Sequence, residues 1–338
     1  MEHNNLQSVS IIIPCRNEKK FIGKCLDSIL ANNYPVEKME IFVVDGMSTD
    51  GTRDIIIDYG KKYSFIRLLD NSKRTTPVAL NIGIKNSKNN IIIRMDAHAT
   101  YKSDYILKCA TFLEKYDADN IGGVWIVKSR ENTIIGRGIS AAMSSFFGSG
   151  DAYYKIGLER LKIVDTVPFG CYKKEVFDKI GLFNENLERS QDLEFNLRLK
   201  KAGGRIYLFP EIVGYYYQRS KLKEFAKHNF KDGIWVTYPL RFVKTPFRPR
   251  HYVPLLFVLM LIFLIIAGFF MKPFFYLLLI LLSFYLIFLL YFSFKIFLAK
   301  KDPTLLISLP VVFLVRHLSY GFGELWGAVL LLIRPKLK

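Results

Sequence analysis

Three short polar segments in the N-terminal half carry residue types that could bind a ligand. They are residues 14–18 (PCRNE), 45–52 (DGMSTDGT) and 94–98 (RMDAH). In the third segment, Asp96 and His98 flank one small residue, so a tight turn would bring a carboxylate and an imidazole toward one cation. Such a pair suits a divalent metal, Mn²⁺ or Mg²⁺, and these metals commonly bridge a protein to a diphosphate. Taken singly, each segment is equally well explained as a turn or a helix cap.

Two further acids, and the arginine that opens the third segment, could take part in chemistry. Asp192 and Glu194 stand in the first turn of a predicted helix that begins near Ser190. A carboxylate there could act as a general base, or it could simply stabilise the positive end of the helix dipole. The spacing of Asp192 and Glu194 does not show which of them is the better candidate for a general base. Arg94 interrupts an apolar run; in a cleft it could contact a diphosphate, whereas a position at the sheet edge is the simpler expectation for an arginine.

The polar segments each follow a predicted strand. Continuous apolar runs indicate strands at residues 9–14, 40–44, 66–69 and 91–95. Helical spacing of apolar residues lies between them, at residues 21–30, 53–63 and 77–85. This alternation predicts an α/β fold with a parallel sheet covered on both faces. Ligands bind beyond the carboxyl ends of the strands in such sheets, so we expect the three polar segments to meet at one edge.

The composition excludes several classes of protein. The chain has 338 residues, and 48 basic against 30 acidic side chains give a formal net charge of +18. Hydrophobic residues make up 51% of the chain and aromatic residues 15%, which excludes a disordered, collagenous or small disulfide-stapled protein. The four cysteines show no CxxC spacing, so neither a zinc site nor a disulfide framework is predicted, and a reducing cytosol fits.

The apolar excess is concentrated after residue 251. The runs 252–271 and 274–298 are long enough to cross a bilayer. A third run, 305–333, is interrupted by polar residues and a proline, and its topology is left open. Lysines and arginines cluster before the first run, and no signal-peptide pattern opens the chain. These features predict a multi-pass protein of the cell (inner) membrane with its N-terminal part in the cytoplasm.

Residues 216–251 are basic and rich in aromatic side chains. A segment of this kind directly before a membrane helix is expected to lie on an anionic membrane surface. No nucleic acid is expected as a partner, because no recognition motif accompanies the basic residues. The predicted division is therefore a cytoplasmic domain at 1–215, this membrane-surface segment at 216–251, and a membrane domain at 252–338.

The order and spacing of several segments resemble a known family. VSIIIPCRNE, VVDGMSTDGT, ALNIGI and RMDAHA resemble the nucleotide-binding half of family 2 glycosyltransferases, which have the GT-A fold. DTVPFG and QDLEFN make the chain most similar to the ExoA-like subgroup, which includes the succinoglycan glucosyltransferase. The resemblance covers roughly residues 8–255, and the combination is far more specific than any single motif. It implies a Rossmann-like, mostly parallel central sheet with helices on both faces, followed by C-terminal transmembrane helices.

Carried over position by position, the resemblance implies roles for individual residues. It assigns the nucleotide pocket to four residues, namely Pro14, Asn17, Glu18 and Asp45. Asp45 would read the pyrimidine base. Asp96 and His98 occupy the place of the family's DxD motif, so they would hold the metal, and Asp96 also the sugar-diphosphate. Histidine in place of the common aspartate favours Mn²⁺ over Mg²⁺, because imidazole is the softer ligand. Asp192 matches the catalytic base.

Candidate acceptor residues come from three places in the chain. Glu194 lies beside the expected base, and Gly170 could let backbone approach the sugar. The third place is residues 228–235 (HNFKDGIW), where processive relatives carry a QxxRW motif. This sequence keeps Trp235 but has lysine and isoleucine at the Gln and Arg positions, which favours the addition of one sugar. Asp232 and Trp235 could still line the acceptor site.

The resemblance therefore predicts a membrane-anchored inverting glycosyltransferase. It would move one hexose from a nucleotide sugar, a UDP-sugar, to a lipid-linked (polyprenyl) saccharide in polysaccharide or glycan biosynthesis. One alternative is transfer to polyprenyl phosphate itself. A sugar-phosphate nucleotidylyltransferase would need a glycine-rich and basic phosphate loop near the N-terminus, which SIIIPCRNE does not supply. A non-catalytic membrane scaffold is the remaining alternative, and it would function unchanged with Asp192→Asn.

Overall fold

The computed structural model describes residues 6–243 and 247–333, and the chain divides into two compact units. Unit 1 comprises Met1–Ile126 and Gly157–Tyr216, and unit 2 comprises Val127–Ile156 and Tyr217–Lys338. The predicted division placed residues 127–156 in the first domain. In the structure they pack instead with the C-terminal helices, because α5 (Ile134–Met143) buries its apolar face against α13 (Leu305–Ile333). Residues 244–246 of the predicted membrane-surface segment lie outside the described residues.

The first half of the sheet in unit 1 is parallel. Its strands are ordered β3 (Ile66–Asp70), β2 (Met39–Asp45), β1 (Val9–Cys15) and β4 (Ile91–Arg94). Nearly every side chain of β1 and β2 is buried, which explains why these strands read as continuous apolar runs. The predicted strands and helices of this half agree with the observed ones to within one residue at each end.

The second half of the sheet adds antiparallel pairs. The order continues from β4 to β8 (Cys171–Lys173), β6 (Asn120–Ser129), β9 (Ile206–Gln218) and β5 (Ala99–Tyr101), and β7 (Lys162–Ile163) pairs with β9. Strand β8 is antiparallel to both β4 and β6, and β9 is antiparallel to β5 and β7. The predicted α/β sheet is therefore confirmed, and it is a mixed sheet whose parallel strands form the N-terminal part.

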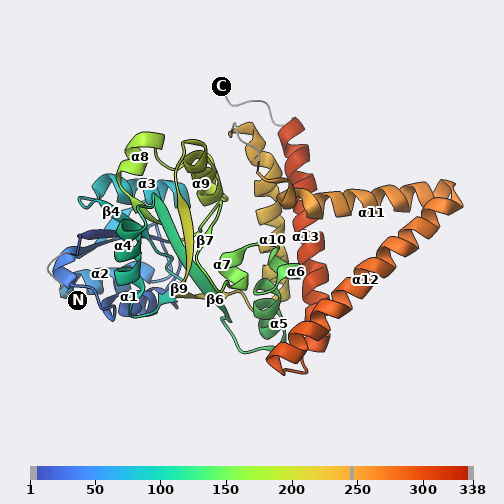
Figure 1. The fold of residues 1–338 in the computed structure, drawn as a ribbon, viewed down its shortest axis with the longest axis horizontal. Coiled ribbons are helices and arrows are strands. Elements are labelled where there is room, and N and C mark those ends of the chain that lie inside the picture. Colours follow the sequence, from blue (N-terminus) through green and yellow to red (C-terminus); the bar gives the residue numbers. More distant parts are fainter. Residues whose placement is uncertain (1–5, 244–246, 334–338) are drawn as a thin grey trace. The chain divides into compact units, whose positions relative to one another are not determined.

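Helices cover both faces of this sheet, as predicted (Figure 1). One face packs against α1 (Ile22–Leu30), α2 (Thr52–Lys62) and α4 (Tyr105–Lys115) in a single apolar cluster. The other face packs against α3 (Thr76–Asn86), where Gly83 lies directly on the side chain of Ile12. The short helix α8 (Glu175–Ile180) and the longer α9 (Gln191–Lys201) follow later in the chain.

Unit 2 contains the long apolar helices. They are α11 (Val253–Phe270), α12 (Lys272–Lys300) and α13, and the helices around them are α10 (Leu222–Thr237), α6 (Phe146–Ser149) and α7 (Tyr153–Ile156). Three stretches of the described chain, Pro249–Phe270, Lys272–Lys300 and Leu305–Ile333, are long and apolar enough to cross a membrane. The third run is one continuous helix that includes Pro310.

Two of the polar residues that interrupt the third apolar run, Arg316 and His317, have partners within unit 2. His317 Nε2 donates to the carbonyl of Phe147 at 2.8 Å, and its Nδ1 accepts from the hydroxyl of Tyr285 at 3.0 Å. Arg316 donates to the carbonyl of Gly148 and to the side chain of Asn229 on α10. Helix α10, inside the predicted membrane-surface segment, packs closely along α13 through glycines of both helices. These contacts explain why α13 is less apolar than the two helices before it.

The packing of α3 on β1 can be tested with two helical glycines. A Cβ at Gly83 would clash with the fully buried Ile12, so Gly83→Ala should lower the free energy of unfolding by about 1–3 kcal/mol through overpacking. Gly23 on α1 has its nearest neighbour 3.8 Å from the same position, so Gly23→Ala should be neutral or stabilising by up to about 1 kcal/mol. Thermal unfolding in detergent measures both. If Gly83→Ala unfolded no earlier than Gly23→Ala, the described packing would be wrong.

Candidate functional site

The carboxyl ends of β1, β2 and β4 meet at one edge of the sheet. Cys15 of β1 pairs with Asp45 of β2, and Ile12 pairs with Arg94 of β4. The loops that follow these strands are the three polar segments found in the sequence. The structure therefore brings them together, as the geometry of a parallel sheet predicted.

The first two loops hold each other through hydrogen bonds. The backbone N–H of Asn17 donates to Ser48 Oγ at 2.8 Å, and the side-chain oxygen of Asn17 accepts from the N–H of Thr49 at 2.9 Å. Asn17 and Met47 both adopt the left-handed backbone region, with φ of 54° and 58°. Non-glycine residues rarely adopt this conformation outside constrained or functional loops. Pro14 is half-buried at the end of β1, beside this pair of loops.

Asp45 is a buried carboxylate whose oxygens are both engaged. One oxygen accepts from Arg53 Nη1 at 2.8 Å and from the N–H of Ser48 at 2.9 Å, and the other accepts from the Ser48 hydroxyl. Arg53 also forms an ion pair with Asp70 at 2.8 Å, and these carboxylates raise its pKa further. Sequence spacing did not reveal Arg53, because its partners lie on two different strands.

A carboxylate and a phenol hold the two ring nitrogens of His98. Glu18 Oε1 lies 3.0 Å from Nδ1, and the Tyr216 hydroxyl lies 3.1 Å from Nε2. An ionised carboxylate only accepts hydrogen bonds, so in the neutral imidazole Nδ1 carries the hydrogen and Nε2 accepts from Tyr216. Glu18 thus leaves the lone pair on Nε2, which could ligate a metal once the Tyr216 hydroxyl releases it. Tyr216, on β9, was missed by sequence reasoning.

Arg94 lies between two of the predicted functional carboxylates. Its Nη2 is 3.5 Å from Asp96 Oδ1, and its Nη1 is 3.9 Å from Asp192 Oδ2. The expectation that Arg94 lies on an edge strand was wrong, because its strand β4 is an interior strand with β1 on one side and β8 on the other. The residue is only 6% exposed. Asp96 and Asp192, which are far apart in sequence, are thereby brought to one buried cation.

Asp192 begins α9 just after a residue in the left-handed region, Ser190, with φ of 58°. Its Oδ1 accepts from the N–H of Leu193 at 3.0 Å. Burial raises the pKa of Asp192, and the nearby Arg94 opposes this shift without cancelling it. Asp192 is therefore a carboxylate whose pKa lies above the ordinary aspartate value, as suits a proton acceptor.

Glu194 is engaged elsewhere on the same helix. Its two oxygens accept from Nε and Nη2 of Arg198 at 2.8 and 3.0 Å. Arg198 also donates to the carbonyl of Leu182 at 2.9 Å. This bidentate pair ties α9 to the preceding loop, and it occupies the carboxylate that was predicted to hold an acceptor.

A buried asparagine in the same motif anchors α9 to the sheet. Asn196 Oδ1 accepts from the side chain of Asn120 on β6 at 2.7 Å. Its Nδ2 donates to Thr166 Oγ1 and to the carbonyl of Val167, both at 3.0 Å. Asn196 is fully buried, so these bonds are shielded from water. Sequence reasoning missed this residue, whose signal was a polar side chain within the apolar face of the helix.

Aromatic rings connect the His98 side of the site to the Arg94 side. Trp125 on β6 stacks on Tyr216 with ring centroids 4.8 Å apart, and it lies 4.1 Å from the ring of Phe169. The Arg94 guanidinium lies over Phe169 at 5.7 Å. Gly170 accepts the N–H of Arg94 through its carbonyl at 3.0 Å, and a Cβ there would clash with the Tyr172 ring.

The remaining predicted site residues, Asp232 and Trp235, belong to α10 in unit 2. Asp232 Oδ2 lies 3.3 Å from His228 Nε2. Trp235 interrupts the helical backbone, with φ of −81° and ψ of 18°, and its ring lies edge-on to Tyr238. Their predicted role at an acceptor site stays a prediction.

Asp96 and His98 supply donor atoms of the type that divalent metals bind, but only two of them, so a metal held here would take most of its ligands from a substrate. No group of three or more His, Cys, Asp or Glu side chains among the described residues is arranged to hold a metal. One carboxylate and Nε2 of one imidazole are present, and Glu18 orients the ring as carboxylates do at metal-binding histidines. Diphosphate and water oxygens would have to complete the coordination.

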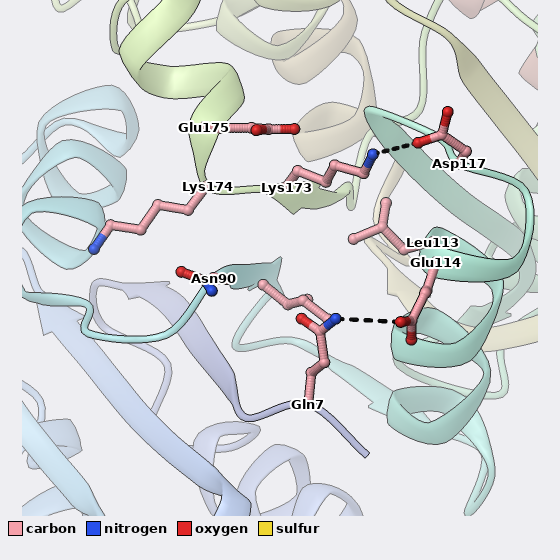
Figure 2. Close-up of a pocket in the computed structure, with 9 residues that line it drawn as sticks. Gln7, Asn90, Leu113, Glu114, Asp117, Lys173, Lys174 and Glu175 are labelled. Carbon is pink, nitrogen blue, oxygen red and sulfur yellow. Dashed lines mark hydrogen bonds and ion pairs between the residues drawn. The ribbon is translucent and has the colours of Figure 1, made fainter. Parts of the chain in front are cut away.

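A separate hollow of about 430 Å³ lies at the opposite edge of the sheet, near the amino ends of β1 and β4 (Figure 2). Charged residues line it, but the ones that face each other are paired. Lys173 binds Asp117 at 2.6 Å, and Gln7 donates to Glu114 at 3.4 Å. Because it lies away from the carboxyl ends of the strands, where the three polar loops meet, we assign it no part in the site.

Comparison with known proteins gives a family and two curated relatives. The family model described as "Glycosyl transferase family 2" matches residues 10–181, half of the chain. A protein of Methanococcus voltae, named dolichyl N-acetyl-alpha-D-glucosaminyl phosphate 3-beta-D-2,3-diacetamido-2,3-dideoxy-beta-D-glucuronosyltransferase, is 32% identical over 93% of this chain and 95% of its own. Succinoglycan biosynthesis protein ExoA of Rhizobium meliloti (strain 1021) is 28% identical over 71% of this chain and 77% of its own.

A solved structure shares the fold. The mannosyltransferase PcManGT from Pyrobaculum calidifontis, solved in complex with GDP-Man and Mn²⁺, aligns with a TM-score of 0.52 and 19% identity. The alignment covers 72% of this chain and 67% of that chain. It confirms the predicted GT-A-like fold.

The anchoring of α9 can be tested at Asn196. Asn196→Ala would leave Asn120, Thr166 and the Val167 carbonyl without a buried partner, so the free energy of unfolding should fall by about 2–4 kcal/mol. Asn186, which is exposed and hydrogen-bonded to Asn184 within the described part of the chain, is the matched control. Asn186→Ala should stay within about 0.5 kcal/mol of wild type. Equal unfolding temperatures for the two variants would contradict the anchoring role.

Proposed function

Since the chain belongs to glycosyl transferase family 2 and is therefore a glycosyltransferase, we propose that it transfers a single hexose or hexose-derived residue from a nucleotide sugar to a lipid-linked saccharide. The observation that carries the proposal is the meeting of Asp96 and Asp192 at the carboxyl edge of the sheet. The resemblance to this family found in the sequence is confirmed.

The nucleotide is proposed to bind where the first two loops lie against each other. Asn17 and Glu18 follow β1, and Asp45 ends β2 with its carboxylate fixed by Arg53 and Ser48. Asp45 is fully buried here, so it would accept a base N–H, such as that of uracil, only when the loop after it opens to admit the nucleotide. Pro14 contributes an apolar surface with no N–H of its own. These features support a UDP-sugar as the donor.

Asp96 and Nε2 of His98 are the groups that would hold a divalent cation, with Mn²⁺ favoured by the imidazole. Such a cation, when bound, neutralises the charge that develops on a leaving diphosphate. Glu18 keeps the His98 ring in place and, in the neutral imidazole, directs the hydrogen to Nδ1. Asp96 is 17% exposed at the side chain, so it remains accessible to solvent or ligand.

Asp192 is proposed as the general base. The acceptor hydroxyl attacks the anomeric carbon, its proton passes to the Asp192 carboxylate, and the bond between that carbon and the diphosphate oxygen breaks. One base acting without a covalent intermediate inverts the anomeric centre, so an α-linked donor gives a β-linked product. Because Arg198 occupies Glu194, we propose that Glu194 fixes α9 rather than holding the acceptor.

Two features support an acceptor carried by a membrane lipid. Three helices of the described chain are long and apolar enough to span a bilayer. The relative from Methanococcus voltae, which aligns over 93% of this chain, is named for transfer to a dolichyl-linked sugar phosphate. That name favours a lipid-linked saccharide over polyprenyl phosphate itself. The basic residues before α11 support an orientation with unit 1 in the cytoplasm.

A transfer assay tests this function. The protein in nanodiscs containing anionic lipid would be incubated with radiolabelled UDP-sugars, Mn²⁺ and either polyprenyl phosphate or polyprenyl-linked N-acetylglucosamine. We expect one labelled sugar per acceptor, on the lipid-linked saccharide only. Transfer to polyprenyl phosphate alone would select the other acceptor, and the absence of transfer with any nucleotide sugar would reject the proposal.

The same assay tests the base. Asp192→Asn should lower kcat by about 10²–10⁴-fold, the contribution typical of a general base. Its unfolding temperature should not fall, because burial disfavours the ionised form of this group. Asp178, an exposed acid on α8, provides the control, and Asp178→Asn should keep wild-type activity. Full activity of a folded Asp192→Asn variant would assign the base elsewhere.

The raised pKa of Asp192 predicts a pH dependence. The base must be ionised to accept a proton, so kcat/KM should fall as pH drops through its pKa. Because burial raises that pKa above the ordinary value of 3.8, the acid limb should have its midpoint above pH 3.8. Measurement of kcat/KM across pH, with protein stability checked at each point, locates the midpoint. Activity that persists below pH 3.8 would contradict the assignment.

A further inference from the structure

Arg94 is an unusual residue for the interior of a sheet. It is 6% exposed, in a strand whose other residues, Ile91, Ile92 and Ile93, are buried and aliphatic. Among the described residues, its Nε and Nη1 have no hydrogen-bond partner. A buried arginine is expected to satisfy its donors, so an incompletely bonded one calls for a specific reason.

The guanidinium faces two acids that come from different parts of the chain. Asp96 follows β4, and Asp192 begins α9. The separations of 3.5 and 3.9 Å are within the range of a strong charge interaction but too long for good hydrogen bonds. Without a cation between them, two partly buried carboxylates would repel each other. Charge, more than closed hydrogen bonds, therefore holds both acids near Arg94.

We propose that Arg94 is a positioning residue that sets the direction of the base Asp192 relative to the metal ligand Asp96. This inference rests on the proposed function of the same site. One planar group within 4 Å of both acids keeps them close to each other, and because these contacts are longer than hydrogen bonds they leave lone pairs on each carboxylate available. Arg94 also competes with a divalent cation for Asp96, since both are positive and share the same carboxylate.

A purely structural role has different consequences. Arg94 lies over the ring of Phe169, so its loss could weaken packing and reduce every activity together. Positioning instead affects catalysis through Asp192 and leaves metal binding intact. The two roles therefore separate in measurements of metal affinity and in the coupling between Arg94 and Asp192.

Two substitutions at Arg94 provide the test. Arg94→Met removes the charge at similar length, and Arg94→Lys keeps the charge but loses the planar fork. We expect kcat to fall about 100-fold for Arg94→Met and about 10-fold for Arg94→Lys, with KM for the donor changed less than about 3-fold. Arg67→Met is the matched control, because Arg67 also lies over a phenylalanine ring, on β3, but is exposed at the sheet edge. It should keep wild-type kcat.

Two measurements decide between these roles: the affinity for Mn²⁺, and the dependence of the Arg94→Met effect on Asp192. Binding of Mn²⁺, alone and with UDP, would be followed by electron paramagnetic resonance of the free ion. Arg94→Met should bind Mn²⁺ at least as tightly as wild type, because a competing cation has been removed. In an Asp192→Asn background, Arg94→Met should lower kcat less than about 3-fold, since groups that act together are not additive. If Arg94→Met does not fold, Arg94→Lys is carried through the same comparisons.

The outcomes separate this inference from the function on which it rests. Wild-type protein that neither transfers sugar nor binds Mn²⁺ would reject the proposed function. Active wild-type protein with an unchanged kcat in the folded Arg94 variants would reject the positioning role alone. Equal losses from Arg94 substitution in the wild-type and the Asp192→Asn backgrounds, or weakened Mn²⁺ binding in a folded variant, would also overturn it.

Discussion

Strand β1 is paired in parallel on both sides, with β2 and with β4, and these two registers set the positions of the three polar loops at the site. Side chains alternate between the two faces of a strand, so a slip of one residue would exchange those faces. In β4 such a slip would put Arg94 where Ile93 now lies, inside the apolar cluster under α1 and α4. The burial of the isoleucines thus enforces the position of the arginine beside them.

The parallel half of the fold could be predicted from sequence because its strands are buried on both faces and its helices are amphipathic. The antiparallel half could not, since β5, β7 and β8 have only two or three residues and show no periodicity. Residues 127–156 were assigned to the first domain for a related reason. Their helix α5 is apolar on one face, and sequence alone does not say which partner covers that face.

At the site, residues at strand ends were predictable, and their partners were not. The position of Asp96 and His98 after a strand indicated a ligand site, but Tyr216 and Arg53 join it through long-range contacts without a local signal. The position of Arg94 was predicted from its residue type, because arginines are usually exposed. Its actual burial follows from the two strands, β1 and β8, that flank β4. A charged residue in an otherwise aliphatic interior strand is thus better interpreted from sheet topology than from average burial.

The membership of residues 127–156 in unit 2 affects how this chain could change in evolution. The polypeptide passes between the units three times, at 126–127, 156–157 and 216–217, so neither unit is a continuous stretch of gene. His317 and Arg316 of α13 bind the carbonyls of Phe147 and Gly148, and those bonds tie together two stretches that are distant in sequence. A new set of membrane helices could not be acquired by simple C-terminal fusion. Recombination would have to replace residues 127–156 at the same time, so this segment and the three long apolar helices would be exchanged together.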